Sequence, residues 1–585
     1  MKIKRSFLVT LGLVGLSGLI LAGCGKSVIS ASHGVTTVSK ANQKKNGVIS
    51  DAQIKKNLGS KLSTTRQDSQ KALVATYQKA ATSNKYWLSS PYVKVNPYKR
   101  SPLTGLVIFQ TSEASKVKVT VPGKTAKTTI STTYKSYTTK HSIPVMGLYA
   151  GKTNRVKLTV TSKSGKVTTK TVNMKTAALP SNLAKIKFNV KTAKTSKMAL
   201  GPGNDKLTFL VRTTHQPFGV DAKGDIRWYS TDYNQHVFKQ LKNNHILRLA
   251  KKNNGAKVYN EILEEDYLGR VYKQYDLSTE THSANAGNKK YPVKSDEYTL
   301  IHHDAVQLPN GNYLLTVSDG TENMTSRKNS KKRYSEDTIV ELDHKTGKIT
   351  RVIDFKKILP ASMYNNTKLT GNSRDWLHMN SIYYDQKTGD IVVSSRNQDM
   401  VMRLNYKTLK WRWIYSSKTK SSWPKAYRKY LLTADKGTPY TGGQHAAILL
   451  PNSTSTNQYL QVFDNNIAVT YGDKKTSGKY SQGITYRINP KTKKVKKVQS
   501  YGASLGTGNF SPIIGSNRYL YNGNSLLDFG YLSLGTKSNI REVTKNGDLV
   551  YNLEMSNLEN KGYTYRAERF SLYPDNDGSL AKTYE

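Results

Sequence analysis

The chain of 585 residues contains a single cysteine, Cys24. An intrachain disulfide, a set of cysteine ligands for a metal and a catalytic thiol are therefore excluded. Acidic residues are also scarce, since 39 Asp and Glu stand against 91 Lys and Arg, which gives a formal net charge of +52. Histidine is rare as well, with 11 residues, so histidines that recur in similar sequence contexts indicate a place for chemistry.

The apolar run from Phe7 to Leu21 follows a basic start and ends in Leu21-Ala22-Gly23-Cys24. It is too short for a membrane span and lacks a second charged flank, so residues 1–23 are predicted to be a signal peptide. The ending resembles a bacterial lipoprotein box, which would make Cys24 the lipid-bearing first residue of the mature chain. The alternative is an ordinary secretory signal with a chance cysteine. We expect a protein anchored by lipid at the extracytoplasmic face of the bacterial cell membrane.

Removal of Lys2, Lys4 and Arg5 with the signal would lower the net charge from +52 to +49. The remaining basic residues are scattered through Thr/Ser/Lys-rich turns, without a recognition helix or stacked-aromatic motif, so we expect no nucleic-acid partner. For an exported protein, the expected anionic neighbours are lipid headgroups or wall polymers. A solvated basic surface without a specific partner is the alternative.

Composition divides the rest of the chain into four parts. Residues 24–50 are small and polar, as in a flexible tether. Residues 51–90 show helical spacing, with Asp51 as a candidate cap, and are predicted to form a helical spacer. Residues 91–178 are predicted to form a small β-sandwich domain. Its expected strands are Leu106–Phe109, Val117–Val121, His141–Val145 and Val156–Val160.

Residues 179–585 contain a loose repeat of a strand, a polar turn and a second strand. The second strands begin at Ile226, Val271, Ile349, Trp411, Val495 and Leu549, with steps of 45, 78, 62, 84 and 54 residues. Six copies with variable insertions are typical of a six-bladed β-propeller, in which each blade buries its faces against its neighbours. Two stacked sandwich domains would not require a repeat. The predicted fold is therefore all-β, with a β-sandwich before a six-bladed propeller.

Three histidines and one arginine lie in short turns of this second part, close to predicted strands. His303 precedes the strand 313–317, His378 precedes the strand 382–384, Arg396 ends the strand 391–395 and His445 opens the strand 446–450. We expect them to belong to different blades and to converge on the central channel. Three imidazoles and a guanidinium in one channel would form an anion site.

The ordered motifs HHDAVQLPNGN, DWLHMNS followed by SSRNQD, GGQHAA and YTYRAERFSLYP resemble the bacterial arylsulfate sulfotransferases that use no nucleotide sulfate donor. NPYKRSPLTGLVIF and HSIPVMGLYAGK are similar to that family's N-terminal domain, so the resemblance covers roughly residues 90–585. It implies a lipoprotein-type member that moves a sulfuryl group from a phenolic sulfate ester to a phenolic acceptor, by a ping-pong mechanism with a covalent sulfohistidine. Neither a cofactor nor a metal is expected. A homodimer and a monomer are both compatible with the resemblance.

The resemblance also assigns residue roles. His445 matches the nucleophile, whereas His303, His378 and Arg396 match the groups that hold the sulfate. Asn380 matches a polar neighbour of that site. The chain departs from Gram-negative members in lacking their disulfide near the active site, which places the local rigidity in doubt but not the chemistry.

The residue types suit this reaction. Sulfuryl transfer resembles phosphoryl transfer in its loose transition state, with negative charge on the peripheral oxygens, so catalysis depends on positioning and electrostatic stabilisation. Arg396 offers a planar fork for two sulfate oxygens. A neutral imidazole is a competent nucleophile, and either His378 or His303 could protonate the departing aryl oxygen.

Other interpretations of the same residues are structural. His302 and His303 could cap a turn, His378 could be a structural hydrogen-bonding residue, and Arg396 could pair with Asp375 or Asp399. The remaining histidines lie outside the motifs and are expected to be ordinary: His33, His141, His215, His236, His245, His282 and His344.

Rival enzyme classes lack their motifs. A formylglycine sulfatase requires C/S-x-P-x-R, a nucleotide-dependent sulfotransferase a phosphate-cradling P-loop, and a typical zinc hydrolase H-E-x-x-H. None of the three occurs in this sequence. The main alternative is a non-catalytic, lipid-anchored propeller that binds an anionic ligand or a cell-wall polymer.

Overall fold

The computed structural model describes residues 39–40, 48–201, 206–280, 282–283, 299–327, 330–335, 337–360, 362–363, 373–468 and 472–573. The predicted signal peptide, the lipid site at Cys24 and most of the predicted tether lie outside these residues. The described chain is mostly β, as predicted, with an N-terminal β domain followed by a series of four- and five-stranded sheets. No helix in this part of the chain combines the length and apolarity needed to cross a membrane.

Six of the sheets are meanders, in which most strands pair with the next strand along the chain. Three of these sheets follow one another along the chain. Their strands, from the first outward, are β11 (Asn234–Gln240), β12 (Ile246–Ala250), β13 (Glu261–Glu265), β14 (Val271–Asp276) and β1 (Lys61–Ser63); β16 (Ile301–Gln307), β17 (Tyr313–Ser318), β20 (Asp337–Leu342) and β21 (Ile349–Asp354); and β23 (Met379–Asp385), β24 (Asp390–Ser395), β25 (Met400–Asn405) and β26 (Trp411–Ser416).

The other three sheets include strands that are distant in sequence. They are β28 (His445–Leu449), β29 (Gln458–Asp464), β30 (Gln482–Asn489), β31 (Lys494–Tyr501) and β27 (Thr433–Ala434); β32 (Ser516–Tyr519), β33 (Ser525–Leu532), β34 (Lys537–Val543), β35 (Leu549–Ser556) and β7 (Lys187–Ala193); and β36 (Thr564–Arg569), β8 (Thr208–Arg212), β9 (Phe218–Val220) and β10 (Ile226–Tyr229). The last sheet therefore joins the C-terminal strand β36 to β8, near the start of the series.

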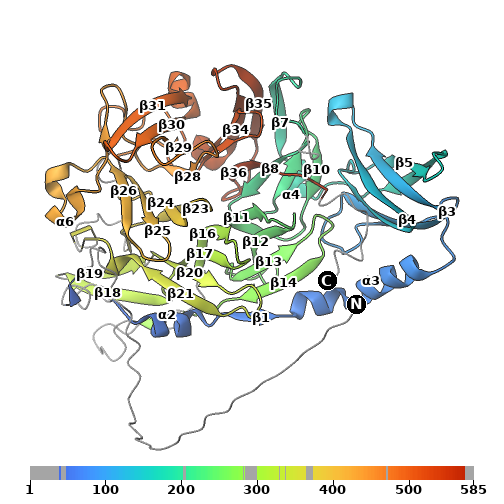
Figure 1. The fold of residues 1–585 in the computed structure, drawn as a ribbon, viewed down its shortest axis with the longest axis horizontal. Helices are drawn as coiled ribbons and strands as arrows, with labels where there is room; N and C mark the ends of the chain where they lie inside the picture. Colours follow the sequence, from blue (N-terminus) through green and yellow to red (C-terminus); the bar gives the residue numbers. More distant parts are fainter. Residues whose placement is uncertain are drawn as a thin grey trace, which may run out of the picture.

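The first strands of successive sheets contact one another in a closed order. β11 contacts β16, β16 contacts β23, β23 contacts β28, β28 contacts β32, β32 contacts β36, and β8 contacts β11 (Figure 1). The predicted repeats mark the outer strands of the same sheets. Five begin at the predicted residue and the sixth, β31, begins one residue earlier, at Lys494. The six sheets thus form a ring with their first strands on the inside.

Apolar side chains between neighbouring sheets hold the ring together. Between the sheets of β23–β26 and β28–β31, for example, Val392, Val401, Leu460 and Ile484 have no exposed surface, and Trp413 is only 1% exposed. Burial of such side chains contributes about 1.5–3 kcal/mol each. Packing on both sheet faces explains why apolar residues stand at consecutive positions in these strands, as in Ile391, Val392 and Val393, none of which is exposed.

The N-terminal domain consists of β2 (Tyr92–Val95), β3 (Thr104–Val121), β4 (Ile130–Met146), β5 (Thr153–Ser162) and β6 (Val167–Lys175). Two of the predicted strands, Leu106–Phe109 and Val117–Val121, are the two halves of β3. The β3–β4 register shifts around Ser115, where β3 exchanges β2 for β5 as its second neighbour. All five strands are thus hydrogen-bonded into one continuous sheet, because β3 changes one of its partners partway along while it keeps β4 on its other side.

The predicted helical spacer contains α2 (Asp51–Leu58) and α3 (Thr65–Thr82), but β1 lies between them and pairs with β14. The segment is therefore part of the ring's outer surface, and α2 packs on β21 and α3 on β14 (Figure 1). Asp51 is not the cap of α2. Ser50 precedes the helix and its hydroxyl accepts a hydrogen bond from the Gln53 amide at 3.1 Å, so Asp51 is the first helical residue.

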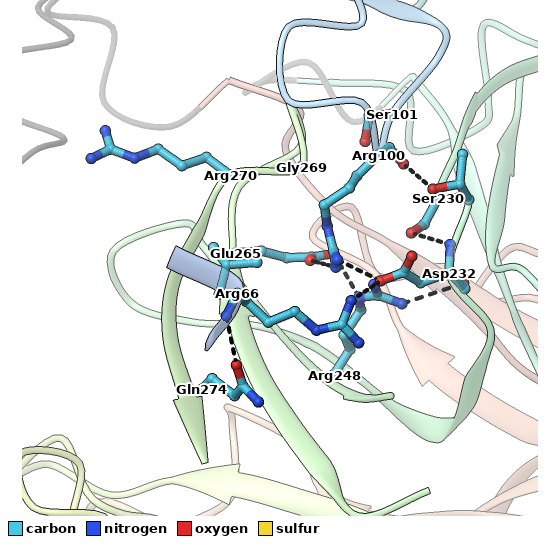
Figure 2. Close-up of polar contacts among 12 residues, drawn as sticks. Arg66, Arg100, Ser101, Ser230, Asp232, Arg248, Glu265, Gly269, Arg270 and Gln274 are labelled. Carbon is cyan, nitrogen blue, oxygen red and sulfur yellow. Dashed lines mark hydrogen bonds and ion pairs between the residues drawn. The ribbon is translucent and has the colours of Figure 1, made fainter. Parts of the chain in front are cut away.

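A buried ion network joins the spacer, the N-terminal domain and the ring (Figure 2). Asp232 lies 2.6 Å from Arg100 of the N-terminal domain, 3.1 Å from Arg248 of β12 and 3.3 Å from Arg66 of α3. Glu265 of β13 lies 2.7 Å from Arg100 and 2.6 Å from Arg248. These shared carboxylates fix the three parts relative to one another.

Smaller elements lie outside the ring sheets. They are the sheet of β15 (His282–Ser283), β18 (Thr321–Arg327), β19 (Ser330–Ser335) and β22 (Ser373–Asp375), and the short helices α4 (Ser181–Ala184) and α6 (Lys425–Arg428).

Candidate active site

The four predicted residues lie at or beside the inner strands. His303 is inside β16 rather than in a turn, His378 immediately precedes β23, and His445 is the first residue of β28. Arg396 directly follows β24, which pairs with β23, and its amide donates to the His378 carbonyl at 3.0 Å. The prediction of a different sheet for each residue was therefore wrong for His378 and Arg396, which share one sheet.

Irregular backbone directs the histidines toward the ring centre. His303 and His378 have left-handed φ values of 48° and 51°, and Ala446, next to His445, has a φ of 58°. At or next to these residues, the pairing of each inner strand with its neighbouring strand shifts register. A bulge with a left-handed residue turns a side chain out of the normal alternation. The left-handed backbone conformation costs a non-glycine residue on the order of 1–3 kcal/mol, and such strain is concentrated at functional sites.

A fourth histidine belongs to this group. His236 of β11 has a φ of 53° at the equivalent register shift, and its ring stacks on that of His303 with centroids 4.8 Å apart and planes 14° apart. The His303 ring lies 4.5 Å from that of His378 on the other side. The expectation that His236 is an ordinary histidine was wrong, because its sequence context gave no sign of the bulge that places it here.

Tyr565 of β36 lies next to the same group of histidines. Its ring centroid lies 4.2 Å from that of His236 and 6.4 Å from that of His445, and its hydroxyl lies 3.4 Å from Nδ1 of His303. The hydroxyl donates to the carbonyl of Asn380 at 3.1 Å. The segment YTYRAERF carried family resemblance, but no feature of the sequence assigned Tyr565 to the site.

His445 is held as one tautomer. Its Nδ1 lies 2.7 Å from Oδ1 of Asn465 and 3.1 Å from the Gly443 carbonyl, which are both acceptors. The amide nitrogen of Asn465 donates to the carbonyls of Ser511 and Ile514, which fixes its oxygen toward the imidazole. Nδ1 of His445 therefore carries the hydrogen and Nε2 keeps its lone pair.

The charge state of His445 follows from its surroundings. It is 2% exposed. Burial, followed by the positive charge of Arg396, lowers its pKa well below the usual value, although the hydrogen bond that His445 donates to Asn465 acts in the opposite direction. The pKa of His303 is likewise lowered well below its usual value by burial and by His378, His236, His302 and His445. Both imidazoles are neutral at neutral pH.

His378 is different because it has a carboxylate partner. Its Nδ1 makes a short contact with Oδ2 of Asp375. Burial alone would raise the pKa of Asp375, but the charges of His378, His302 and Arg396 lower it overall, so this carboxylate is ionised. The ionised carboxylate accepts a hydrogen bond from Nδ1 of His378, so Nε2 is the ring nitrogen that this contact does not use. His302 has a similar partner, with its Nε2 3.0 Å from Asp337.

Several polar atoms of the site have no hydrogen-bond partner within the described chain. They are Nε of Arg396, Oδ1 of Asn380 and Nδ1 of His236, all of them buried. Nη1 of Arg396 donates to Asn397 at 2.8 Å, and the Asn380 amide donates to the Gln444 carbonyl at 2.7 Å, directly before His445. Buried polar atoms without partners are rare in proteins. Here they indicate a polar ligand between Arg396 and the histidines.

A buried ion cluster supports the site. Arg566 of β36 makes two contacts with the carboxylate of Asp304, at 2.8 and 3.1 Å, and donates to the Asn380 carbonyl at 2.7 Å. Lys239 lies 3.0 Å from the same carboxylate. Sequence reasoning assigned no role to these residues, although Asp304 follows His303 and Arg566 lies in the late motif. Their pairing depends on closure of the ring.

The buried histidines predict a loss of stability in acid. Burial is the main cause that lowers the pKa of His236 to about 3 and of His141 and His215 to about 4, and the pKa values of His303 and His445 are also lowered. In the unfolded chain these groups titrate near 6.5, so below that pH the unfolded state binds more protons. The free energy of unfolding should fall from pH 6.5 toward about 4, by up to ~1.4 kcal/mol per pH unit for each such group. Urea unfolding across this range measures it, and a flat dependence would contradict the neutral, buried state of these imidazoles.

Comparison with known proteins identifies the family of the chain. The family described as arylsulfotransferase (ASST) matches residues 192–566, and the arylsulfotransferase Ig-like domain matches residues 92–177. The arylsulfate sulfotransferase AssT of Lelliottia amnigena is 25% identical over 559 residues, which cover 78% of this chain and 87% of the relative. The arylsulfate sulfotransferase AssT of Escherichia coli O6:H1 (strain CFT073) is 26% identical over 548 residues, which cover 75% and 84%. The chain therefore belongs to the arylsulfotransferase family, with that family's Ig-like domain at its N-terminal side.

Proposed function

We propose that this chain is a six-bladed propeller enzyme that transfers a sulfuryl group from a phenolic sulfate ester to a phenolic acceptor, without a nucleotide donor. His445 is the nucleophile. The observation that carries the proposal is the fixed tautomer of His445, whose Nδ1 hydrogen is held by Asn465 and Gly443 while Nε2 keeps its lone pair beside a guanidinium. Membership of an enzyme family favours this function over a non-catalytic binding propeller.

In the first half-reaction, the lone pair of His445 Nε2 attacks the sulfur of the donor. The N–S bond forms as the bond between sulfur and the aryl oxygen breaks, and the leaving oxygen takes both electrons of that bond. The Nδ1 hydrogen stays on His445 and is donated to Oδ1 of Asn465, which stabilises the positive charge that develops on the ring. In the second half-reaction, the acceptor oxygen attacks the same sulfur, and the N–S electron pair returns to Nε2.

We assign proton transfer to His378 rather than to His303. His378 has the ionised Asp375 on Nδ1, a partner that can balance the charge of a ring passing a proton through Nε2, whereas burial and four other imidazoles lower the pKa of His303. His378 gives its proton to the departing phenolate and takes one from the acceptor phenol. Such acid–base assistance typically contributes 10²–10⁴-fold in rate.

Arg396, His303 and Asn380 form the remainder of the sulfate site. The unpartnered Nε of Arg396 supplies a donor toward the sulfuryl oxygens. Its charge stabilises the negative charge that spreads over these oxygens in a loose transition state. Arg396 is paired to Asn397 and lies near Asp375, whose charge offsets part of the cost of burying the guanidinium.

His236 is proposed to hold His303 in position by ring stacking. His236→Asn keeps a residue that tolerates the left-handed backbone but removes the ring, and we expect kcat/KM for the donor to fall by roughly 10–10²-fold, since small misplacements have effects of this size. His236→Phe retains a stacking face and should lose much less. Steady-state kinetics with an aryl sulfate measure both variants, and His344→Asn, in the turn after β20, is the control. Equal losses in the Asn and Phe variants would instead indicate a role for the His236 nitrogens.

The proposal is tested by trapping the intermediate. The protein is incubated with an aryl sulfate without an acceptor and digested under mildly alkaline conditions, and the peptide containing His445 should carry the mass of one added SO₃ group. Addition of a phenol before digestion should remove that mass and yield the new aryl sulfate. Two results would contradict the proposal. One is a His445 peptide that stays unmodified although the donor is turned over, and the other is release of free sulfate at a rate that does not depend on the acceptor.

We further propose that the mature chain begins at Cys24 and is held by lipid at the extracytoplasmic face of the cell membrane. The basic start, the apolar run and the Leu-Ala-Gly-Cys ending support this placement. A Cys24→Ala variant should appear in the soluble fraction, whereas the wild type should remain with the membranes.

A further inference from the structure

The N-terminal domain contains a groove with a volume of about 440 Å³. The residues that line it are far in the sequence from the histidines of the candidate active site. The groove walls come from the segment before β2 and from β3, β5 and β6. This volume lies within the range of about 300–1,000 Å³ that is typical of small-ligand sites. The sulfuryl-transfer mechanism uses none of the residues that line it.

Trp87 forms an aromatic wall of this groove and is 45% exposed. It is held rigidly, because the Gln110 amide donates to the Tyr86 carbonyl at 2.8 Å and the Leu88 amide donates to the Gln110 carbonyl at 3.2 Å. The indole nitrogen donates to the Asn84 carbonyl at 3.1 Å. The apolar ring face therefore stays exposed at low entropic cost, as in binding sites where tryptophan supplies a stacking surface.

A buried donor also lines the groove. Gln110 is 9% exposed, and its Nε2 has no hydrogen-bond partner among the described residues. An unpaired buried donor costs about 1–3 kcal/mol, so its retention on the groove wall requires an explanation. A ligand oxygen would supply the missing acceptor once the Gln110 amide turns toward the groove.

Most of the polar lining residues are uncharged. Its hydroxyl groups belong to Ser89, Thr111, Ser112, Ser115, Ser162, Thr168 and Thr169. The charged side chains are Glu113, Lys166 and Lys170, and Lys170 already donates to the Ser89 carbonyl at 2.6 Å, while Glu113 accepts from Ser164 at 2.8 Å. The chain has 91 basic residues, but the groove is lined by only two lysines and one glutamate. This small net charge does not favour an anionic polymer as the ligand.

We propose that this groove binds a neutral glycan. A pyranose ring presents an apolar face of C–H groups, which suits the exposed Trp87, and a rim of hydroxyl groups, which suits the serines, threonines and Gln110. The proposal is independent of sulfuryl transfer. Its effect would be to place the enzyme on a carbohydrate surface through the N-terminal domain.

Binding is tested with the mature full-length protein and three neutral probes: maltohexaose, cellohexaose and chitohexaose. Calorimetric titration should detect at least one of them, with similar affinity at low and high salt because neither partner relies on charge. Trp87→Ala should weaken binding by at least about tenfold, equivalent to ~1.4 kcal/mol. Tyr137→Ala is the matched control, since Tyr137 is an aromatic residue of the same domain that is 40% exposed but does not line the groove. Both variants should retain the sulfuryl-transfer activity of the wild type.

Four results would overturn the proposal. One is the absence of binding by all three probes, and another is equal binding by Trp87→Ala and the wild type. The third is a wild-type dimer that Trp87→Ala converts to a monomer, which would make the groove an interface between two copies of the chain. Binding that disappears at high salt would likewise point to an anionic ligand and contradict a neutral one.

Discussion

His445→Ala is expected to lower the rate of phenol release from an aryl sulfate by more than about 10³-fold, because removal of a covalent nucleophile eliminates the two-step route. The substitution also removes the only ring that Asn465 holds through a 2.7 Å hydrogen bond. Release of a fluorescent phenol, with saturating acceptor present, measures the effect. Circular dichroism should be unchanged, since the replaced side chain lies at the site rather than between the sheets.

Added imidazole provides a second readout for this variant. A free imidazole that enters the space left by the side chain would supply the missing nitrogen and restore part of the rate. His245→Ala is the control, because His245 pairs with Glu264 in another part of the ring. Wild-type rates in His445→Ala would remove this residue from the mechanism, whatever the other histidines do.

Asp304→Asn is expected to destabilise the fold by about 3–5 kcal/mol, the range found when one partner of a buried ion pair is removed. Burial opposes ionisation of Asp304, but Arg566 and Lys239 outweigh it and lower its pKa, so it is charged in the folded protein. Without that charge, the buried Arg566 would lose its ionic partner, and the partly buried Lys239 would lose its carboxylate. Chemical unfolding at neutral pH measures the change.

The matched control for Asp304→Asn is Glu554→Gln. Glu554 lies 4.0 Å from Lys191, and both side chains are about half exposed, at 47% and 53%. Exposed pairs of this kind contribute about 0–1 kcal/mol, so this variant should unfold almost as the wild type does. Similar losses in the two variants would mean that the Asp304 cluster is not an essential buried pair.

The repeat pattern of the sequence was sufficient to locate the outer strands of all six sheets, because burial on both faces requires apolar residues at regular positions. It also placed His303, His378 and His445 close to inner strands. The sequence could not reveal that Leu106–Phe109 and Val117–Val121 are one strand. That continuity depends on a register shift near Ser115, which leaves the local alternation of side chains intact.

The residues that were missed share one physical cause. Bulges or hydrogen bonds between sheets bring three residues to the site, namely His236, Asn465 and Tyr565. Neither of these two features produces a periodic pattern in the sequence. His236 is 67 positions from His303 and stacks on it only because β11 and β16 are neighbours in the ring. The capping of α2 by Ser50 instead of Asp51 is a local case, since both residue types favour helix starts.

The position of β36 affects when the enzyme can first act. Tyr565 and Arg566 belong to this last described strand, which pairs with β8 more than 350 positions earlier. During synthesis His445 and its neighbours are made long before the strand that completes their surroundings. A nascent or truncated chain without β36 therefore has an open ring and lacks Tyr565 and Arg566, so we expect activity to begin only after this strand has been made.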